Sequence, residues 1–241
     1  MRLEPVQIAG FNQAFRSLVP ESVVGLVPGT RFETWGVGWD QAFRPTRTYL
    51  TVEGQYLTSD ATRTVGVLTN SSVLPPQVAD SASSDREEIE YREKSLIVAL
   101  NQLLGNEWAL GARYKLTDAD REGGFRGQLR GLPGTAGLNQ DVSATLHQLD
   151  LFTAYNHRCG FFARFDAVWS QQSNRDYASD IPGDDFWQYH IVAGYRFWQR
   201  RAEARVGLLN LTDTDYRLNP LTLYSELPRE RTFTAGFKFY F

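Results

Sequence analysis

The chain has 241 residues, a formal net charge of −3 and a pI near 5.7, and its Lys and Arg residues form no basic helix or stripe, which argues against a nucleic-acid partner. Aromatic residues make up 13% of the chain, yet its mean hydropathy is −0.38 and no segment has the roughly 18 consecutive apolar residues of a membrane-spanning helix. The single cysteine, Cys159, excludes an internal disulfide framework and a cysteine-rich metal site.

Segments in which apolar and polar residues alternate with a period of two follow one another along the chain, and almost no segment has a helical period. In chain order they cover residues 5–16, 30–43, 46–59, 92–104, 107–119, 143–157, 161–175, 185–199, 202–212 and 232–241. The first is the weakest, because IAGFNQAF does not settle on one phase. The sequence predicts an all-β protein with about ten antiparallel strands in an up-and-down order.

The connections between these segments alternate between tight and long. The tight ones are FRPTR, LLGNEW, NHRCG and WQRRAE, and the long ones lie around 17–29, 60–91, 120–142, 176–184 and 213–231. Outer-membrane barrels have this asymmetry, with short periplasmic turns and long extracellular loops. An even number of strands places both termini on the periplasmic side. The charged run REEIEYREK, 86–94, falls mostly in the long connection 60–91 and is predicted to be a solvated loop.

Aromatic residues gather at both ends of the apolar faces of these strands. Trp35, Tyr114, Trp169 and Trp187 lie towards the long connections, and Phe43, Trp108, Phe161 and Phe197 lie towards the tight turns. The two interfaces of a membrane select such belts, whereas a soluble β-protein gathers its aromatic residues at mid-strand. The sequence predicts a transmembrane β-barrel, with residues 1–241 as a single outer-membrane domain.

Charged residues recur on the opposite faces of the strands, which face the lumen in a barrel. The predicted lumen-facing charged residues are Arg113, Lys115, Arg164, Asp166, Arg196, Glu203, Arg205 and Lys238. Their mixed signs favour neither cation nor anion selectivity.

The tail TAGFKFYF ends the chain without a cap. Its Thr234, Gly236, Phe239 and Phe241 fit the pattern polar, any, glycine, any, any, aromatic, any, aromatic. This resembles the C-terminal signal by which outer-membrane barrels are recognised for assembly. The resemblance implies the barrel assembly machinery as a partner.

The stretch VGLLNLTDTDYRLNPLTLYSELPRERTFTAGFKFYF, 206–241, resembles the end of TonB-dependent receptors. The matching residues are Asn210, Leu211, Asp213, Tyr216, Asn219, Pro220, Pro228, Arg231, Thr232 and Phe233, while Thr212 stands where the family usually has Phe. The resemblance implies a plugged barrel of about 22 strands that is energised through TonB. Neither the plug nor the TonB-contacting box fits in this chain, so TonB is a partner only if a plug lies upstream. The chain is then either the C-terminal portion of a larger barrel or a shortened relative that closes on itself.

The sequence shows no constellation for catalysis. Of His147, His157 and His190, only His190 falls clearly on an inward face, where Glu203 or Arg205 is its expected neighbour. No Ser, Asp and His grouping shares a depth at the loop end. Asp180, Asp184 and Asp185 lack the full spacing of a Ca²⁺ loop, and GLPGTAG, 131–137, has no strand-to-helix context for phosphate. We expect no enzyme activity, no metal and no cofactor.

These observations predict an outer-membrane receptor or transporter barrel for uptake of a scarce solute, in a Gram-negative-type bacterium. The alternative is a self-contained ten-strand barrel that acts as a passive channel, adhesin or structural protein. A barrel hydrolase with its site among the long loops is a third interpretation. Outer-membrane lipid is an expected partner, and the ligand is unknown. The start MRLEPVQIAG has no secretory signal, so we expect that the signal has been removed or that the chain is a fragment.

Overall fold

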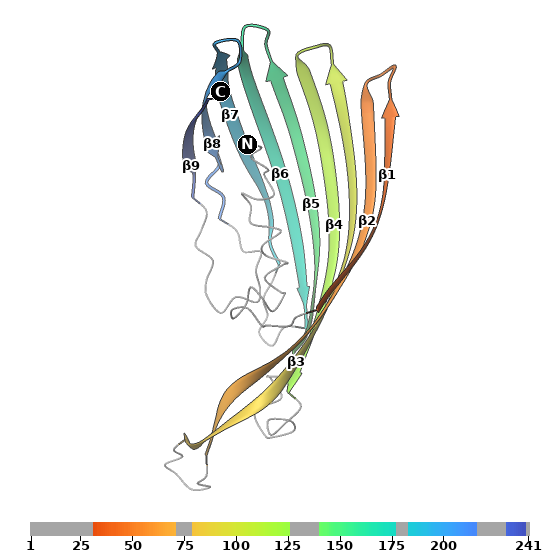
Figure 1. Cartoon of the computed structure of the whole chain (residues 1–241), viewed down its shortest axis with the longest axis vertical. Helices are drawn as coiled ribbons and strands as arrows, with labels where there is room; N and C mark the ends of the chain where they lie inside the picture. The colour runs from red at the N-terminus through yellow and green to blue at the C-terminus, as the bar shows by residue number, and fades with distance from the viewer. Residues whose placement is uncertain (1–30, 71–78, 126–139, 177–182, 216–229, 240–241) are drawn as a thin grey trace.

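The protein folds into one sheet. A computed structural model describes residues 31–70, 79–125, 140–176, 183–215 and 230–239. These residues form nine antiparallel strands and no helix, which confirms the all-β prediction. Each strand pairs with its neighbours in sequence, so the order across the sheet is β1 to β9 (Figure 1).

The strand bounds follow the predicted segments most closely at the tight turns. The strands are β1 (Arg31–Phe43), β2 (Thr48–Asn70), β3 (Ala79–Leu104), β4 (Trp108–Phe125), β5 (Gln140–Asn156), β6 (Phe161–Arg175), β7 (Asp185–Phe197), β8 (Ala202–Leu209) and β9 (Thr232–Phe239). The strand predicted at 5–16 and the last two residues of the tail lie outside the described residues.

Four tight turns lie together at one end of the sheet, at the top of Figure 1. The backbone N–H of Gly160 donates to the carbonyl oxygen of His157 at 3.1 Å and closes the turn between β5 and β6. Gly160 has a φ of 107°, and a Cβ there would lie 2.1 Å from the carbonyl oxygen of Arg196. This turn therefore requires glycine.

The long connection predicted at 60–91 is wrong, because β2 and β3 continue through most of it. The two strands have 23 and 26 residues and pair from Thr48–Gln102 to Asn70–Ala79. The charged run 86–94 is therefore strand and not loop. Its residues keep the period of two: Ile89 and Tyr91 are buried on one side, while Arg86, Glu90 and Arg92 are exposed on the other. Figure 1 shows this hairpin extending far beyond the other strands.

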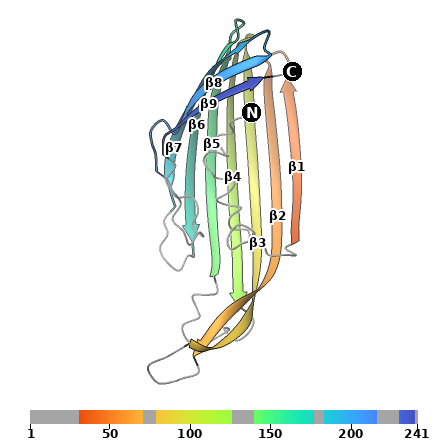
Figure 2. The same ribbon diagram turned by 60° about the vertical axis from the view of Figure 1, so that its left-hand side comes forward.

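The sheet is curved and open (Figures 1 and 2). In the part of the chain that the structure describes, β1 and β9 each pair on one side only, so they form the two edges of the sheet. The described strands thus show the up-and-down antiparallel order that was predicted and do not by themselves close into a barrel.

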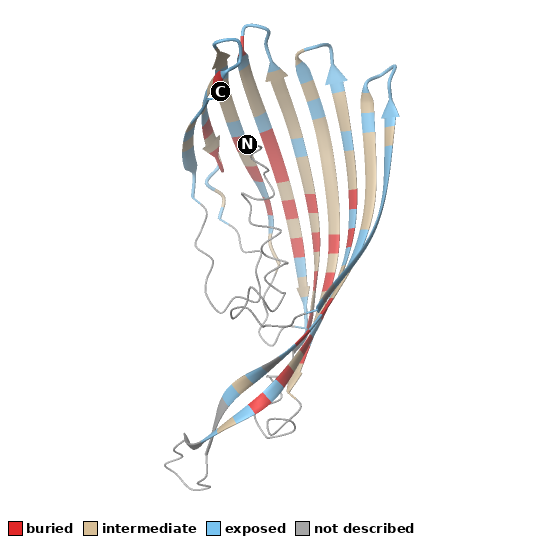
Figure 3. Ribbon diagram, viewed as in Figure 1, coloured by how far each residue is buried: buried red, intermediate tan, exposed pale blue. Residues whose placement is uncertain are grey.

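The strand pairing divides the side chains between two faces. We call the face that carries Trp35, Leu100, Phe165 and Ile191 the aromatic face, and the opposite face the mixed face. Apart from Ala167 and Ala202, the buried hydrophobic side chains lie on the mixed face, including Tyr91, Leu146 and Val168. Figure 3 shows these buried positions mainly in the middle and lower parts of the central strands.

Candidate functional site

The aromatic face carries nearly all the large hydrophobic side chains that the described residues leave exposed. They are Trp35, Val37, Trp39, Phe43, Tyr56, Leu96, Leu100, Leu104, Trp108, Leu110, Leu151, Phe161, Phe165, Trp187, Ile191, Tyr195, Val206, Phe233, Phe237 and Phe239. The described residues form a single layer, so no described element packs on this face. Monomeric soluble proteins rarely expose an apolar patch that crosses every strand of a sheet.

This apolar surface is a band with a limited height. On β4 the aromatic face reads Trp108, Leu110, Ala112, Tyr114 and Leu116, followed by Asp118, Asp120 and Glu122. On β3 it ends at Leu96, and Lys94 and Arg92 follow. Eight residue steps separate Trp108 from Leu116, the last apolar residue, and ten separate it from Asp118, the first charged one. At about 3.4 Å a step and a tilt of about 45°, these steps rise about 19 Å and about 24 Å, so the apolar surface has nearly the height of the roughly 25 Å band of a membrane barrel.

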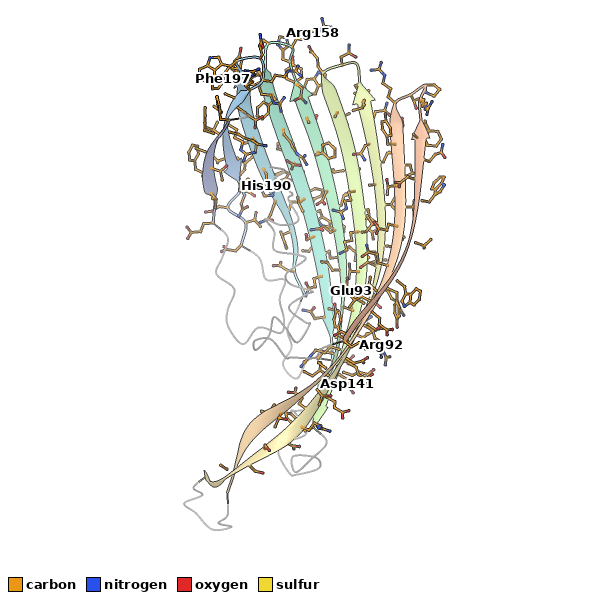
Figure 4. The ribbon with its side chains drawn as sticks, viewed as in Figure 1. Arg92, Glu93, Asp141, Arg158, His190 and Phe197 are labelled. Atoms are coloured by element: carbon orange, nitrogen blue, oxygen red, sulfur yellow. The ribbon has the colours of Figure 1, made fainter. Side chains whose placement is uncertain are left out.

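Aromatic rings with polar tips lie at both limits of the band. At the limit away from the tight turns, Trp169 and Trp187 lie 6.4 Å apart between ring centroids, and Trp169 Nε1 donates to Asp185 Oδ1 at 2.7 Å. At the other limit, Trp108 and Tyr155 lie 4.6 Å apart. Figure 4 shows Phe197 and Arg158 at the tight-turn end and Arg92 and Asp141 towards the opposite end. Each pair of rings thus lies where the surface changes from apolar to charged.

All eight charged residues that were predicted to face a lumen lie on the mixed face. They are Arg113, Lys115, Arg164, Asp166, Arg196, Glu203, Arg205 and Lys238. In register, Arg113 is opposite Asp150, and Glu203 lies between Arg196 and Lys238. Charges of opposite sign are therefore neighbours on this face.

Two arginines on the mixed face combine an ion pair with a ring contact. Arg164 Nε donates to the two carboxylate oxygens of Asp166 at 2.8 and 2.9 Å, and Arg196 Nε donates to Glu203 Oε2 at 3.0 Å. The guanidinium carbons of Arg164 and Arg196 lie 4.7 and 4.2 Å from the ring centroids of Phe152 and Phe162. These contacts hold both arginines against the wall of the sheet.

A row of buried, uncharged polar side chains crosses β5, β6 and β7 on the mixed face. Gln148 of β5 lies opposite Ser170 of β6. Gln188 of β7 lies opposite Val168 of β6, which is the residue next to Ser170 on the same face of β6. These polar residues are at most 1% exposed, and Gln148 Nε2, Ser170 Oγ and Gln188 Oε1 have no hydrogen-bond partner. The sequence pattern did not indicate this row as a site, although its glutamines have the phase of the mixed face.

His190 continues this row, but its neighbours differ from those predicted. It lies opposite Asp166 of β6, and it is not beside Glu203 or Arg205, because the register of β7 and β8 places Glu203 opposite Arg196 and Arg205 opposite Gly194. Its Nδ1 accepts a hydrogen bond from the backbone N–H of Asn210 at 3.0 Å. The neutral ring then carries its proton on Nε2, which is buried without a partner.

Three residues of the receptor-like motif, Asn210, Leu211 and Asp213, follow directly after the end of β8. Asn210 has a φ of 51°, and its side chain bonds the backbone N–H and C=O of Thr214, both at 3.0 Å. Leu211 N donates to the carbonyl oxygen of Tyr189 at 2.9 Å, and Asp213 Oδ1 accepts from the Arg231 backbone N–H at 2.6 Å. These bonds tie the end of β8 to β7 and to the start of β9.

The other predicted motif residues divide between β9 and the part of the chain that is not described. Thr232 and Phe233 begin β9, Thr234 and Gly236 lie on its mixed face, and Phe239 lies on its aromatic face. Tyr216, Asn219, Pro220, Pro228 and Phe241 lie outside the described residues.

The tight turn between β5 and β6 carries an exposed thiol. Cys159 Sγ lies 2.9 Å from His157 Nδ1. The backbone N–H of Phe161, followed by the His157 imidazole, lowers the pKa of the Cys159 thiol, and the thiol in turn raises the pKa of His157. The thiolate is therefore the favoured form at a lower pH than for an isolated cysteine.

The described ranges contain no group of three His, Cys, Asp or Glu side chains that could hold a metal ion. No helix in these ranges is long and apolar enough to span a membrane. Asp184 and Asp185 lie at the start of β7, and Asp180 is outside the described residues. His147 lies at the band's edge, where its Nδ1 is 2.7 Å from the Tyr114 hydroxyl.

No protein-family model matches the chain, and the searches of curated proteins and of solved structures found no match. The resemblance to TonB-dependent receptors therefore stays a prediction.

Proposed function

We propose that the chain forms the wall of an outer-membrane β-barrel. The aromatic face contacts lipid, the mixed face lines the lumen, and the tight turns and both termini lie in the periplasm. One observation carries the proposal: the apolar band crosses the sheet at a roughly constant height, and charged residues follow it directly on β3 and β4. Hydrocarbon of limited thickness selects such a band.

A soluble sheet would need a second layer over the aromatic face. Trp35 and Val37 are 72% and 76% exposed, and even the more central Phe165 is 38% exposed. Burial of each such side chain contributes about 1.5–3 kcal/mol, so a fold that left them all in water would forgo most of its hydrophobic stabilisation. Lipid supplies the missing burial without a second layer.

Within this architecture we assign the chain to a receptor or transporter that takes up a scarce solute. The resemblance of residues 206–241 to TonB-dependent receptors supports this assignment. So does the mixed face, on which Gln148, Ser170 and Gln188 offer hydrogen-bonding atoms that the described residues leave without partners. The barrel assembly machinery would recognise the tail, and TonB would be a partner if a plug lies upstream.

A self-contained ten-strand barrel is the second candidate. The paired charges Arg164–Asp166 and Arg196–Glu203 suit a narrow lumen that is filled by its own side chains. The long β2–β3 hairpin also suits an adhesin, because it extends beyond the band. A passive channel or structural role would follow from the same closed barrel.

The test is to refold residues 1–241 in detergent and to compare electrophoretic mobility with and without boiling, together with far-UV circular dichroism. A β-rich monomer whose mobility changes on boiling supports a barrel that closes by itself. Aggregates without such a band favour a portion of a larger barrel. A β-rich monomer that is soluble without detergent would contradict the membrane proposal.

A further inference from the structure

The four tight turns concentrate positive charge at one end of the sheet. They cover residues 44–47, 105–107, 157–160 and 198–201, which read RPTR, GNE, HRCG and WQRR. Together they contain five arginines and one glutamate, but no lysine or aspartate. The arginines are Arg44, Arg47, Arg158, Arg200 and Arg201, and all five are exposed. Figure 4 shows Arg158 at this end of the sheet.

Backbone hydrogen bonds join these turns into a continuous rim. Each of the first three turns accepts a bond from the hairpin that follows it. The bonds run from Leu103 N to Arg47 O, from Asn156 N to Glu107 O and from Arg196 N to Gly160 O, at 3.1, 2.7 and 2.9 Å. Successive turns are two strand spacings apart, which is about 10 Å. The rim therefore presents its arginines as a row along the edge of the apolar band.

None of the five arginines forms an ion pair within the described ranges. The carboxylate of the turns, Glu107, is half-buried and accepts a hydrogen bond from the Tyr155 hydroxyl at 3.3 Å. At the opposite limit of the band, Arg92 instead forms ion pairs with Glu90 and Glu122, at 3.2 and 3.7 Å. The tight-turn end thus carries positive charge that no described carboxylate neutralises.

The depth of these arginines follows from their distance along the chain to the aromatic residues of the band. Arg44 directly follows Phe43. Arg158 precedes Phe161 by three residues, which rise at most about 7 Å at a tilt of about 45°. A bilayer has a hydrocarbon core of about 30 Å within a total of about 40–45 Å, so each headgroup layer is about 5–8 Å thick. In the proposed membrane placement, the guanidinium groups therefore lie at the level of the lipid phosphates.

An aromatic ring marks the same level at the turn between β7 and β8. Trp198 is 66% exposed, and its ring centroid lies 5.2 Å from that of Phe197 and 5.9 Å from that of Phe239. Indole rings favour the boundary between hydrocarbon and headgroups. The backbone N–H of Arg201 donates to the carbonyl oxygen of Trp198 at 3.0 Å and closes the turn. Arg200 and Arg201 are thus held beside an interfacial ring.

We infer that the arginines of the tight turns bind the phosphodiester groups of anionic phospholipids in the periplasmic leaflet. A guanidinium group keeps its charge at physiological pH and can donate two parallel hydrogen bonds to a phosphate. A zwitterionic headgroup neutralises its own phosphate, so the rim favours a headgroup with net negative charge, such as phosphatidylglycerol. The inference rests on the proposed membrane function and adds the headgroup class and the leaflet of the lipid partner.

Fluorescence quenching in vesicles tests this inference on the whole gene product. Cys159 is exposed in the same turn as Arg158 and is labelled with a bimane fluorophore, after any cysteine outside residues 1–241 has been replaced by serine. The vesicles consist of phosphatidylcholine with a small fraction of phosphatidylglycerol or phosphatidylcholine that is spin-labelled near the headgroup. The ratio of quenching by the two labelled lipids gives the local enrichment of the anionic lipid.

Two double substitutions remove the same charge from opposite ends of the sheet. Arg158→Gln with Arg200→Gln removes two arginines of the rim. The matched control, Arg92→Gln with Arg175→Gln, removes two arginines that are paired with carboxylates. A basic residue near an anionic surface contributes about fivefold to binding, so we expect an enrichment of about fivefold or more that the rim variant loses and the control keeps. Arg158→Lys with Arg200→Lys should retain most of it, because the charge remains.

Equal quenching by the two lipids, equal losses in the rim variant and the control, or an enrichment that persists in about 1 M salt, where the Debye length is about 3 Å, would each overturn the inference. Labelling of Cys159 by a membrane-impermeant maleimide in intact cells would overturn the assignment to the periplasmic leaflet. Absence of quenching by either lipid would instead overturn the proposed membrane function, because the turn would then not lie near a bilayer.

Discussion

Replacing Ile191 by Arg is expected to destabilise the inserted protein strongly. Ile191 is 44% exposed in the middle of β7, on the aromatic face between Trp187 and Phe197. Arginine near the bilayer midplane of a barrel costs about 2–4 kcal/mol, which lowers the folding equilibrium constant by about 30-fold to 700-fold. In water, an exposed Ile→Arg change usually falls within about 0.5 kcal/mol of zero. The size of the effect thus separates lipid from water as the surrounding medium.

The assay is reversible urea unfolding of the protein inserted in phosphatidylcholine vesicles, followed by tryptophan fluorescence and electrophoretic mobility. Ser173→Arg is the matched control, because Ser173 is exposed on the same face of β6 beyond Trp169. Near the membrane interface, where Ser173 is expected to lie, the cost of an arginine on the lipid face falls to about 0–1 kcal/mol. Equal effects of the two substitutions, or a stabilising Ile191→Arg, would refute the assignment of the aromatic face to lipid.

Three further outcomes are expected. Gly111→Ala should destabilise the protein by about 1–3 kcal/mol, because its Cβ would lie 2.1 Å from the Phe152 ring, whereas Gly66→Ala, with nothing within 4 Å, should leave the urea midpoint almost unchanged. Asn210→Ala should lower the free energy of unfolding by about 1–3 kcal/mol, because it removes the hydrogen bonds to Thr214 and places alanine at a positive φ. Asn210→Gly should lower it less, because glycine adopts that φ without strain. Equal losses in the two variants would contradict the contribution of the backbone conformation. The pH midpoint of Cys159 alkylation should lie below that of a free thiol and rise in His157→Ala, since the imidazole helps to lower the thiol pKa; an unchanged midpoint would argue against this contact.

The sequence was sufficient for the strands within the apolar band. The segments predicted at 30–43 and 161–175 agree with β1 and β6 within one residue, because their alternation is uninterrupted and glycine or turn residues flank them. The assignment of Arg164, Asp166 and Arg196 to one face follows from the same alternation and holds in the register.

The extent of β2 and β3 was not predictable by the same reasoning. Residues 60–70 and 79–91 alternate mainly among polar and charged side chains, so only VGVLTN, 65–70, indicated that a strand could extend here, and hydrophobicity gives little other signal of period two. The hairpin is held by continuous backbone pairing from Asp60–Glu90 to Thr69–Ser81, and no single residue type in the sequence indicates this pairing. The absence of hydrogen-bond partners for Gln148 Nε2 and Gln188 Oε1 was also not predictable from the sequence, because it depends on the arrangement of three strands.

The length of the apolar band and the length of the strands that carry it are determined by different factors. β3 has 26 residues and β6 has 15, yet Leu96–Leu104 on β3 and Phe161–Trp169 on β6 both cover eight residue steps of the aromatic face. All the additional length of β3 lies beyond the band. There the same face carries Arg86, Glu88 and Glu90 in place of apolar residues. If strand pairing set the band, it would lengthen with the strand, so an equal band on these two strands of unequal length supports the proposal that the aromatic face contacts lipid.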